Sequence, residues 1–140
     1  MPASSVRRRG ERTVAETLRP VPNDCVEIRC DSAKGRGVYA RAPIGAGTLI
    51  EAAPVIIVPA VQCELIDLTI LHDYYFQWDR GGGAVALGLV SLCNHARQPS
   101  ARVRRNLAQS TLDLIALAPM APGDEVTIDY NCPLWFEAQE

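Results

Sequence analysis

The sequence of 140 residues contains no apolar run of the length, about 18 residues, that a membrane-spanning helix needs. Its N-terminus is polar and rich in arginine, and it lacks the apolar stretch of a secretory signal. The five cysteines are odd in number and form no Cys-x-x-Cys pair, so the sequence predicts neither a disulfide framework nor a zinc cluster. We therefore expect no membrane segment and no bound metal, and the cytoplasm is the default location.

The composition is that of an ordinary folded domain. An apolar fraction of 48% and a mean hydropathy of +0.02 exclude a largely disordered chain, and the length allows one domain with one core. Residues 1–22 hold five arginines against two glutamates, a net +3, so the remainder of a chain with net charge −2 carries −5. We expect a flexible basic arm over residues 1–22 and a folded domain over residues 23–140. The arm is either a solvated terminus or a contact for nucleic acid or an acidic partner.

Short segments with strand-like patterns predict a mainly β fold with short helices. Residues 61–73 instead repeat apolar side chains at helical spacing, which predicts one or two short helices. The pattern alone does not choose among sandwich, barrel and folded-ribbon arrangements. The expected strands are Cys25–Arg29, Val38–Ala40, Thr48–Glu51, Val55–Val58, Tyr74–Trp78, Ala101–Asn106, Leu112–Ala118 and Val126–Tyr130.

Three motifs stand out from this pattern. In Lys34–Gly37, two glycines flank one residue, so the backbone can adopt positive φ or approach a ligand closely, although an ordinary tight turn explains the motif equally well. Asn94 and His95 follow an apolar run, which predicts that both are partly buried and hydrogen-bonded, as a polar cap on a turn would also be. The third motif, Gly123–Tyr130, is a turn followed by a strand that ends on Asp-Tyr.

In this order the three motifs resemble the SET-domain family of S-adenosylmethionine-dependent protein-lysine methyltransferases, over roughly residues 25–135. The resemblance implies the SET fold, in which small twisted sheets of the β-clip type surround a C-terminal pseudoknot. It also implies S-adenosylmethionine as the cofactor, a protein that presents a lysine as the substrate, and methyl transfer to the side-chain amine of that lysine. No metal is implied, because the cysteines of zinc-binding relatives are missing after Tyr130 except for Cys132.

The resemblance assigns roles to individual residues. Tyr130 is the expected catalytic residue, because a tyrosine hydroxyl and backbone carbonyls can orient a neutral amine toward a sulfonium methyl. The expected cofactor contacts are Lys34, Gly35, Arg36, Gly37, Asn94, His95, Tyr130 and Trp135. The expected substrate contacts are Tyr75, Phe76 and Phe136, although core packing explains the aromatic cluster at residues 74–78 equally well.

The chain departs from the family at Ala96 and Ser100, where relatives carry serine and asparagine next to the pseudoknot. These changes leave open a SET-like module that binds a peptide or ligand without catalysis. A β-module that binds nucleic acid through Arg7–Arg9 is a second alternative; apart from these arginines we expect no nucleic-acid contact. A homodimer is left open, since small viral relatives act as dimers. His72 is expected at the surface or at a helix end.

Overall fold

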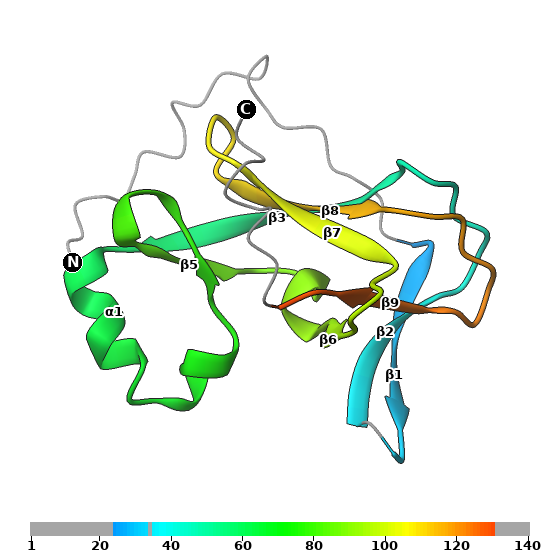
Figure 1. Ribbon diagram of the computed structural model, residues 1–140, viewed down its shortest axis with the longest axis horizontal. Helices are drawn as coiled ribbons and strands as arrows, with labels where there is room; N and C mark the ends of the chain where they lie inside the picture. Colours follow the sequence, from blue (N-terminus) through cyan, green and yellow to red (C-terminus); the bar gives the residue numbers. More distant parts are fainter. Residues whose placement is uncertain (1–23, 34, 131–140) are drawn as a thin grey trace, which may run out of the picture.

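The computed structural model describes residues 24–33 and 35–130, which form two sheets joined by short helical segments (Figure 1). One sheet has the strand order β1-β2-β9-β6 and the other has the order β4-β5-β3-β8-β7. The mainly β fold predicted from the pattern is confirmed. The strands are β1 (Val26–Asp31), β2 (Gly35–Ala40), β3 (Leu49–Val58), β4 (Phe76–Gln77), β5 (Gly83–Ala86), β6 (Asn94–His95), β7 (Ala101–Asn106), β8 (Thr111–Ala116) and β9 (Glu125–Ile128), and the helices are α1 (Ala60–Ile66) and the 3₁₀ helices η4 (Ile70–Asp73), η5 (Asp79–Gly81) and η6 (Leu89–Leu92).

The first sheet begins with an antiparallel hairpin of β1 and β2, whose register runs from Val26 opposite Ala40 to Asp31 opposite Gly35. The Asp31 carboxylate accepts a hydrogen bond from the Ala33 amide at 2.7 Å and so stabilises the start of the turn. We expected a turn over Lys34–Gly37, with the second strand beginning at Val38. This was wrong, because the pairing with β1 continues to Gly35 and places both glycines of the motif inside β2.

The second sheet is built around β3, which is one strand and not the two that the sequence predicts. Its first half pairs with β8 as far as Pro54 opposite Thr111, and its second half pairs with β5 from Val55 onward. Pro54 has no N–H to donate, and it lies where β3 changes partner. Its carbonyl still accepts a hydrogen bond from the Leu87 amide at 2.8 Å. The proline that suggested a break therefore marks a change of neighbour.

The strands expected at Ala101–Asn106 and Leu112–Ala118 are present as β7 and β8, which form a hairpin with Ala101 opposite Ala116 and Asn106 opposite Thr111. All six residues of β8 are buried. They include Asp113, which lies opposite Arg104 and accepts a hydrogen bond from its guanidinium at 2.7 Å. The Thr111 hydroxyl and the Asn106 amide also donate to Asp113, at 2.8 and 3.2 Å. These bonds offset the cost of burying a carboxylate in the middle of the sheet.

A single apolar core joins the two sheets. Val38 and Val126 of the first sheet belong to the same buried cluster as Ile50, Leu112 and Leu114 of the second, and all five side chains are inaccessible to solvent. Full burial of such a side chain stabilises the fold by about 1.5–3 kcal/mol. Because the core uses strands from both ends of the chain, each sheet depends on the other for stability.

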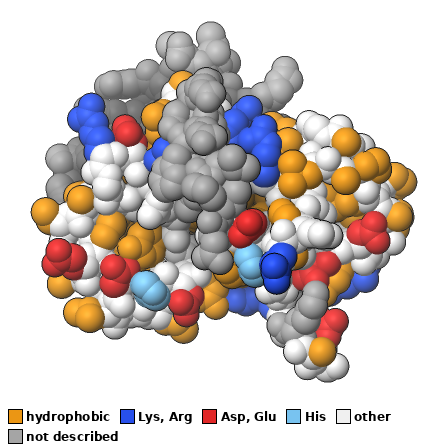
Figure 2. Space-filling model, in the orientation of Figure 1, with side chains coloured by type: hydrophobic (Ala, Val, Ile, Leu, Met, Phe, Trp, Pro, Cys, Tyr) orange, Lys and Arg blue, Asp and Glu red, His pale blue; other side chains and the backbone are white. Residues whose placement is uncertain are grey.

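The helical segment after β3 is exposed. The helices expected over residues 61–73 are confirmed as α1 and η4, but α1 buries only Cys63, and four large apolar side chains between Val61 and Ile70 are 65–83% exposed. Hydrophobic and acidic side chains share this part of the surface, at the left of Figure 2. No helix within residues 24–33 and 35–130 is long and apolar enough to cross a membrane.

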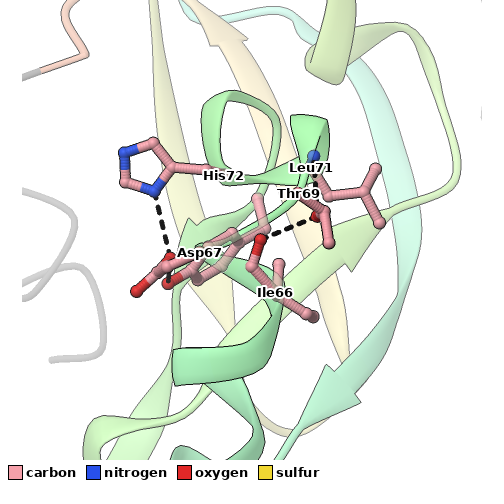
Figure 3. A network of polar contacts seen from close by, with 6 residues as sticks. Ile66, Asp67, Thr69, Leu71 and His72 are labelled. Carbon is pink, nitrogen blue, oxygen red and sulfur yellow. Dashed lines mark hydrogen bonds and ion pairs between the residues drawn. The ribbon is translucent and has the colours of Figure 1, made fainter.

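Polar contacts hold η4 against the end of α1 (Figure 3). The Asp67 carboxylate receives hydrogen bonds from His72 Nδ1 at 3.0 Å and from the Tyr75 hydroxyl at 2.7 Å. These bonds lower the pKa of Asp67 and raise the pKa of His72, while the bond to Asp67 raises the pKa of Tyr75 to about 12. Thr69 begins η4 by donating to the Ile66 carbonyl and accepting from the Leu71 amide. His72 thus lies at the surface in a short helix, as expected.

Candidate active site

The second and third motifs meet where β6 runs parallel to β9 in the centre of Figure 1. Asn94 lies opposite Thr127 and His95 lies opposite Ile128, and the Ala96 amide extends the ladder by donating to the Ile128 carbonyl at 2.9 Å. Parallel neighbours cannot be joined by a hairpin, so the chain between them has to leave the sheet and return. It does so through β7 and β8. The pairing therefore brings two segments that are about 30 residues apart into one site.

Ser100 holds this crossing together. Its hydroxyl donates to the Glu125 carbonyl at 2.9 Å and accepts from the Thr127 amide at 2.9 Å. Its own amide donates to the Thr127 hydroxyl at 3.1 Å. The serine that departs from the family pattern thus satisfies backbone groups on both sides of Val126. The substitution leaves the crossing hydrogen-bonded.

Glu51 fixes the segment that leads into β6. This carboxylate is only 6% exposed, and it accepts hydrogen bonds from the Leu89 and Val90 amides at 2.8 and 2.9 Å. A Cβ on Gly88 would lie 2.6 Å from the Glu51 carboxylate, so only glycine fits beside it. The buried charge is matched by the first amides of η6, which positions the chain just before Asn94.

Gly37, Asn94 and Glu125 form the centre of the site. Asn94 Nδ2 donates to the Arg36 carbonyl at 3.2 Å and to Glu125 Oε2 at 2.7 Å. A Cβ on Gly37 would lie 2.8 Å from Glu125 Oε2 and 2.9 Å from Asn94 Nδ2. Gly37 is therefore required for close approach and not for positive φ, whereas Gly35 does adopt a φ of +83°. The first motif supplies the space into which the second and third motifs place polar side chains.

His95 and Tyr130 form the other side of the crossing. The Tyr130 amide donates to His95 Nδ1 at 2.9 Å, so this nitrogen acts as an acceptor, and the ring carries its proton on Nε2. The two rings lie 5.1 Å apart and are tilted by 42°. The Asp129 carboxylate lies 3.7 Å from His95 Nδ1, beyond hydrogen-bond distance. His95 thus holds the backbone of Tyr130 in place.

The hydroxyl of Tyr130 donates to the Cys93 carbonyl at 2.7 Å, although the residue as a whole is 54% exposed. Partial burial raises the pKa of Tyr130, and nearby groups raise it further: Cys93, Tyr74, Asp73 and Glu125. The hydroxyl therefore keeps its proton at neutral pH. Because that proton is directed to a carbonyl, the oxygen presents its lone pairs to whatever lies beside it. Burial also raises the pKa of the Cys93 thiol, so this cysteine is not an activated nucleophile.

The expected aromatic contacts divide between two places. Tyr75 lies against α1, with its hydroxyl bonded to Asp67 and its ring filling the space above Gly83. Phe76 is half-buried in β4 and packs against the core, and β4 is shorter than the strand expected over residues 74–78. The aromatic residue close enough to affect the pKa of Tyr130 is Tyr74, at the end of η4. The predicted contacts Lys34, Trp135 and Phe136 lie outside the described residues.

Polar groups and accessible backbone meet beside Gly37. The Arg36 carbonyl, Gly37 and Asn94 together provide backbone access and polar groups at one end of β2 and β6. Among the described residues, no group of three histidine, cysteine or acidic side chains could hold a metal ion.

Comparison with known proteins shows the family of the chain. The SET domain family profile matches residues 35–131, which include the second and third motifs and the first motif from Gly35 onward, and the chain belongs to this family. It is 35% identical over 119 residues to the histone-lysine N-methyltransferase, H3 lysine-37 specific, of Schizosaccharomyces pombe, an alignment that covers 84% of this chain and 81% of the relative. The predicted class of enzyme, a SET-domain protein-lysine methyltransferase, is confirmed.

A solved structure shares the fold. The crystal structure of a candidate histone methyltransferase from Plasmodium falciparum superimposes with a TM-score of 0.60 at 23% sequence identity, covering 79% of this chain and 96% of that chain. At this level of identity the likeness shows the fold alone. It confirms the SET fold that the three motifs imply.

Sequence reasoning missed three residues that the structure places in or beside the site. Ser100 was regarded as a weakening departure, Tyr74 was passed over in favour of its neighbour, and Glu125 was read only as part of a turn motif. A signal existed for Glu125 alone, since alternation along the strand puts it on the same face as Thr127. The roles of the other two depend on contacts that no local pattern encodes.

Proposed function

We propose that this SET domain transfers a methyl group from S-adenosylmethionine to the side-chain amine of a lysine in a histone or a similarly basic protein. The observation that carries the proposal is the meeting of Gly37, Asn94 and Tyr130, from three distant parts of the chain, at the β6–β9 crossing. The histone substrate is supported by the relative from Schizosaccharomyces pombe, which is named for that activity.

The chain's own groups divide the work of binding. The Arg36 carbonyl, Gly37 and Asn94 would hold the amino-acid part of the cofactor, which supplies a methyl group activated by a sulfonium when bound. His95 holds the backbone of Tyr130 through a 2.9 Å hydrogen bond. Lys34 and Trp135 stay predicted contacts to the rest of the cofactor.

Tyr130 would orient the amine. Its proton is donated to the Cys93 carbonyl, so its oxygen can accept an N–H from a neutral lysine amine. Accepting that N–H turns the lone pair of the amine away from Tyr130 and toward the methyl donor. This is catalysis by positioning, and it needs no strong base once the lysine has lost its proton.

The electrostatics of the site favour a basic substrate. Asp73 and Glu125 lie near enough to Tyr130 to raise its pKa through their negative charge. A lysine-rich segment approaching this surface is attracted by the same charges. Tyr74 is 38% exposed and contributes to the raised pKa of Tyr130, and it would contact the lysine stem.

The proposal is tested by incubating the protein with a labelled methyl donor and recombinant histones, followed by mass spectrometry of the labelled residues. We expect methylated lysine in the wild-type reaction. Tyr130→Phe removes the acceptor oxygen and should lower kcat by roughly two orders of magnitude with nearly unchanged cofactor affinity. Asn94→Ala should instead weaken cofactor binding.

The matched control is a histone in which the labelled lysine is replaced by arginine. Label that persists on this control, or no label on any histone, would remove the proposed substrate. A Tyr130→Phe protein as fast as wild type would remove the proposed role of the hydroxyl. An affinity-purified protein that binds no S-adenosylmethionine at millimolar concentration would favour a non-catalytic module.

A further inference from the structure

The side chain of Glu125 occupies the space that Gly37 leaves. Glu125 is the first residue of β9 and lies opposite Tyr39 of β2, so its side chain is on the same face of the sheet as the missing side chain of Gly37. Its Oε2 atom lies 2.7 Å from Asn94 Nδ2, and a Cβ on Gly37 would come within 2.8 Å of it. The carboxylate is thus held directly beside the amide of Asn94.

This contact determines which way the Asn94 amide faces. A side-chain amide has two N–H donors and one carbonyl oxygen, and here both donors are used, one by the Arg36 carbonyl and one by Glu125. With both N–H donors used in this way, the carbonyl oxygen Oδ1 is the part of the amide that can accept from a ligand. A flipped amide would put an oxygen against the Glu125 carboxylate, which is repulsive. Glu125 therefore presents Asn94 to the site as an acceptor.

The backbone of Glu125 does not need a charged side chain at this position. Its carbonyl already accepts from the Ser100 hydroxyl, and its strand pairing with Tyr39 is independent of the side chain. A negative group beside an acceptor oxygen favours an ammonium, so a cationic group of the ligand is the partner that suits this pair of side chains.

We infer that Glu125 is a positioning residue for the cofactor: it orients Asn94 Oδ1 toward the α-ammonium group of the amino-acid part and favours that cation by its charge. The inference rests on the proposed use of S-adenosylmethionine. Glu125 would contribute to cofactor affinity by orienting Asn94 and by its negative charge. We expect this contribution to depend on the ammonium group of the ligand.

The test compares the affinity of wild type and two Glu125 variants for two ligands, measured by calorimetric titration. The ligands are S-adenosylhomocysteine and its analogue that lacks the α-amino group. The affinity of the weaker ligand is measured by competition with the tighter one. Glu125→Gln should weaken S-adenosylhomocysteine binding by about tenfold or more, and Glu125→Ala by at least as much. Both variants should bind the deaminated analogue within about twofold of wild type.

Glu27→Gln is the matched control. Glu27 lies in the same cross-strand row, opposite Tyr39 on the other side, and its removal changes the net charge by the same amount. We expect this variant to bind both ligands as wild type does. Thermal unfolding of each variant shows whether the fold is retained, and Glu125→Gln keeps the test valid if Glu125→Ala does not fold.

Three results separate the possibilities. Wild-type protein that binds neither ligand would overturn the proposed cofactor and the inference with it. Wild-type protein that binds S-adenosylhomocysteine, with unchanged affinity in both Glu125 variants, would overturn the inference alone. An equal loss for both ligands would show that Glu125 supports the fold and does not act toward the ammonium group.

Discussion

Replacing Gly37 with alanine is the most direct test of how the site is built. The added Cβ would lie 2.8 Å from Glu125 Oε2, 2.9 Å from Asn94 Nδ2 and 3.2 Å from the ring of Tyr39. Separations below about 3.0 Å are not tolerated, so the two polar side chains have to move. Both are the ends of side chains and can shift without moving β2 or β9.

The expected cost falls on binding. Moving the two groups lengthens the 2.7 Å hydrogen bond between Asn94 and Glu125, and a hydrogen bond to a charged group contributes about 1.5–3 kcal/mol. Because 1.4 kcal/mol corresponds to a factor of ten, we expect the Gly37→Ala variant to bind S-adenosylhomocysteine about tenfold to a hundredfold more weakly.

The fold should be affected much less. Gly37 does not have a positive φ, so alanine gains about 0.4–1 kcal/mol from the lower entropy of the unfolded chain. Crowding beside Glu125 costs about 1–3 kcal/mol, and the two effects partly cancel. The free energy of unfolding, measured in urea, should therefore fall by no more than about 2.6 kcal/mol.

Gly45→Ala is the matched control for the Gly37 variant. Its added Cβ would meet only the Thr48 hydroxyl, at an ordinary 3.7 Å, and we expect unchanged binding. Calorimetric titration of the two variants with S-adenosylhomocysteine gives the comparison. Wild-type affinity in Gly37→Ala would refute the reasoning, because it would show that the contact between Asn94 and Glu125 has no part in binding. A loss of affinity that tracks a loss of stability would refute it as well.

Three further predictions follow from the same site. Ser100→Ala removes a hydroxyl with two backbone partners at the crossing, and it should lower the free energy of unfolding by about 1–3 kcal/mol in urea titrations; an unchanged midpoint would contradict its role. A free lysine has a pKa of about 10.4, so the fraction of neutral, reactive amine grows with pH, while burial raises the pKa of Tyr130 and keeps its hydroxyl protonated. We therefore expect kcat/KM to rise with pH between about 7 and 9.5. A fall in kcat/KM below about pH 10 would show that Tyr130 ionises earlier than expected. Tyr74→Ala should raise KM for the protein substrate by several-fold in steady-state kinetics. Tyr75→Phe removes only the hydrogen bond to Asp67 and should leave KM unchanged. A raised KM in Tyr75→Phe with an unchanged KM in Tyr74→Ala would instead support Tyr75 as the substrate contact.

Local patterns predicted those elements whose partners are close in sequence. The β7–β8 hairpin follows from two strand-like segments separated by a polar turn, and its register places Arg104 opposite Asp113. The change of period at residues 61–73 located α1 and η4 because a helical repeat needs no distant partner. The same kind of reasoning was wrong at Pro54, because a proline at a change of strand partner and a proline between two strands leave the same local pattern.

The order of residues by itself determined the family, the mainly β class and the identity of Gly37, Asn94 and Tyr130 as candidates, since these depend on motifs of a few adjacent residues. Only the tertiary structure decided that Glu125 faces Asn94 and that Ser100 closes the crossing. The physical reason is the parallel pairing of β6 with β9. That pairing joins segments about 30 residues apart, and its register is set by the packing of both sheets on one core.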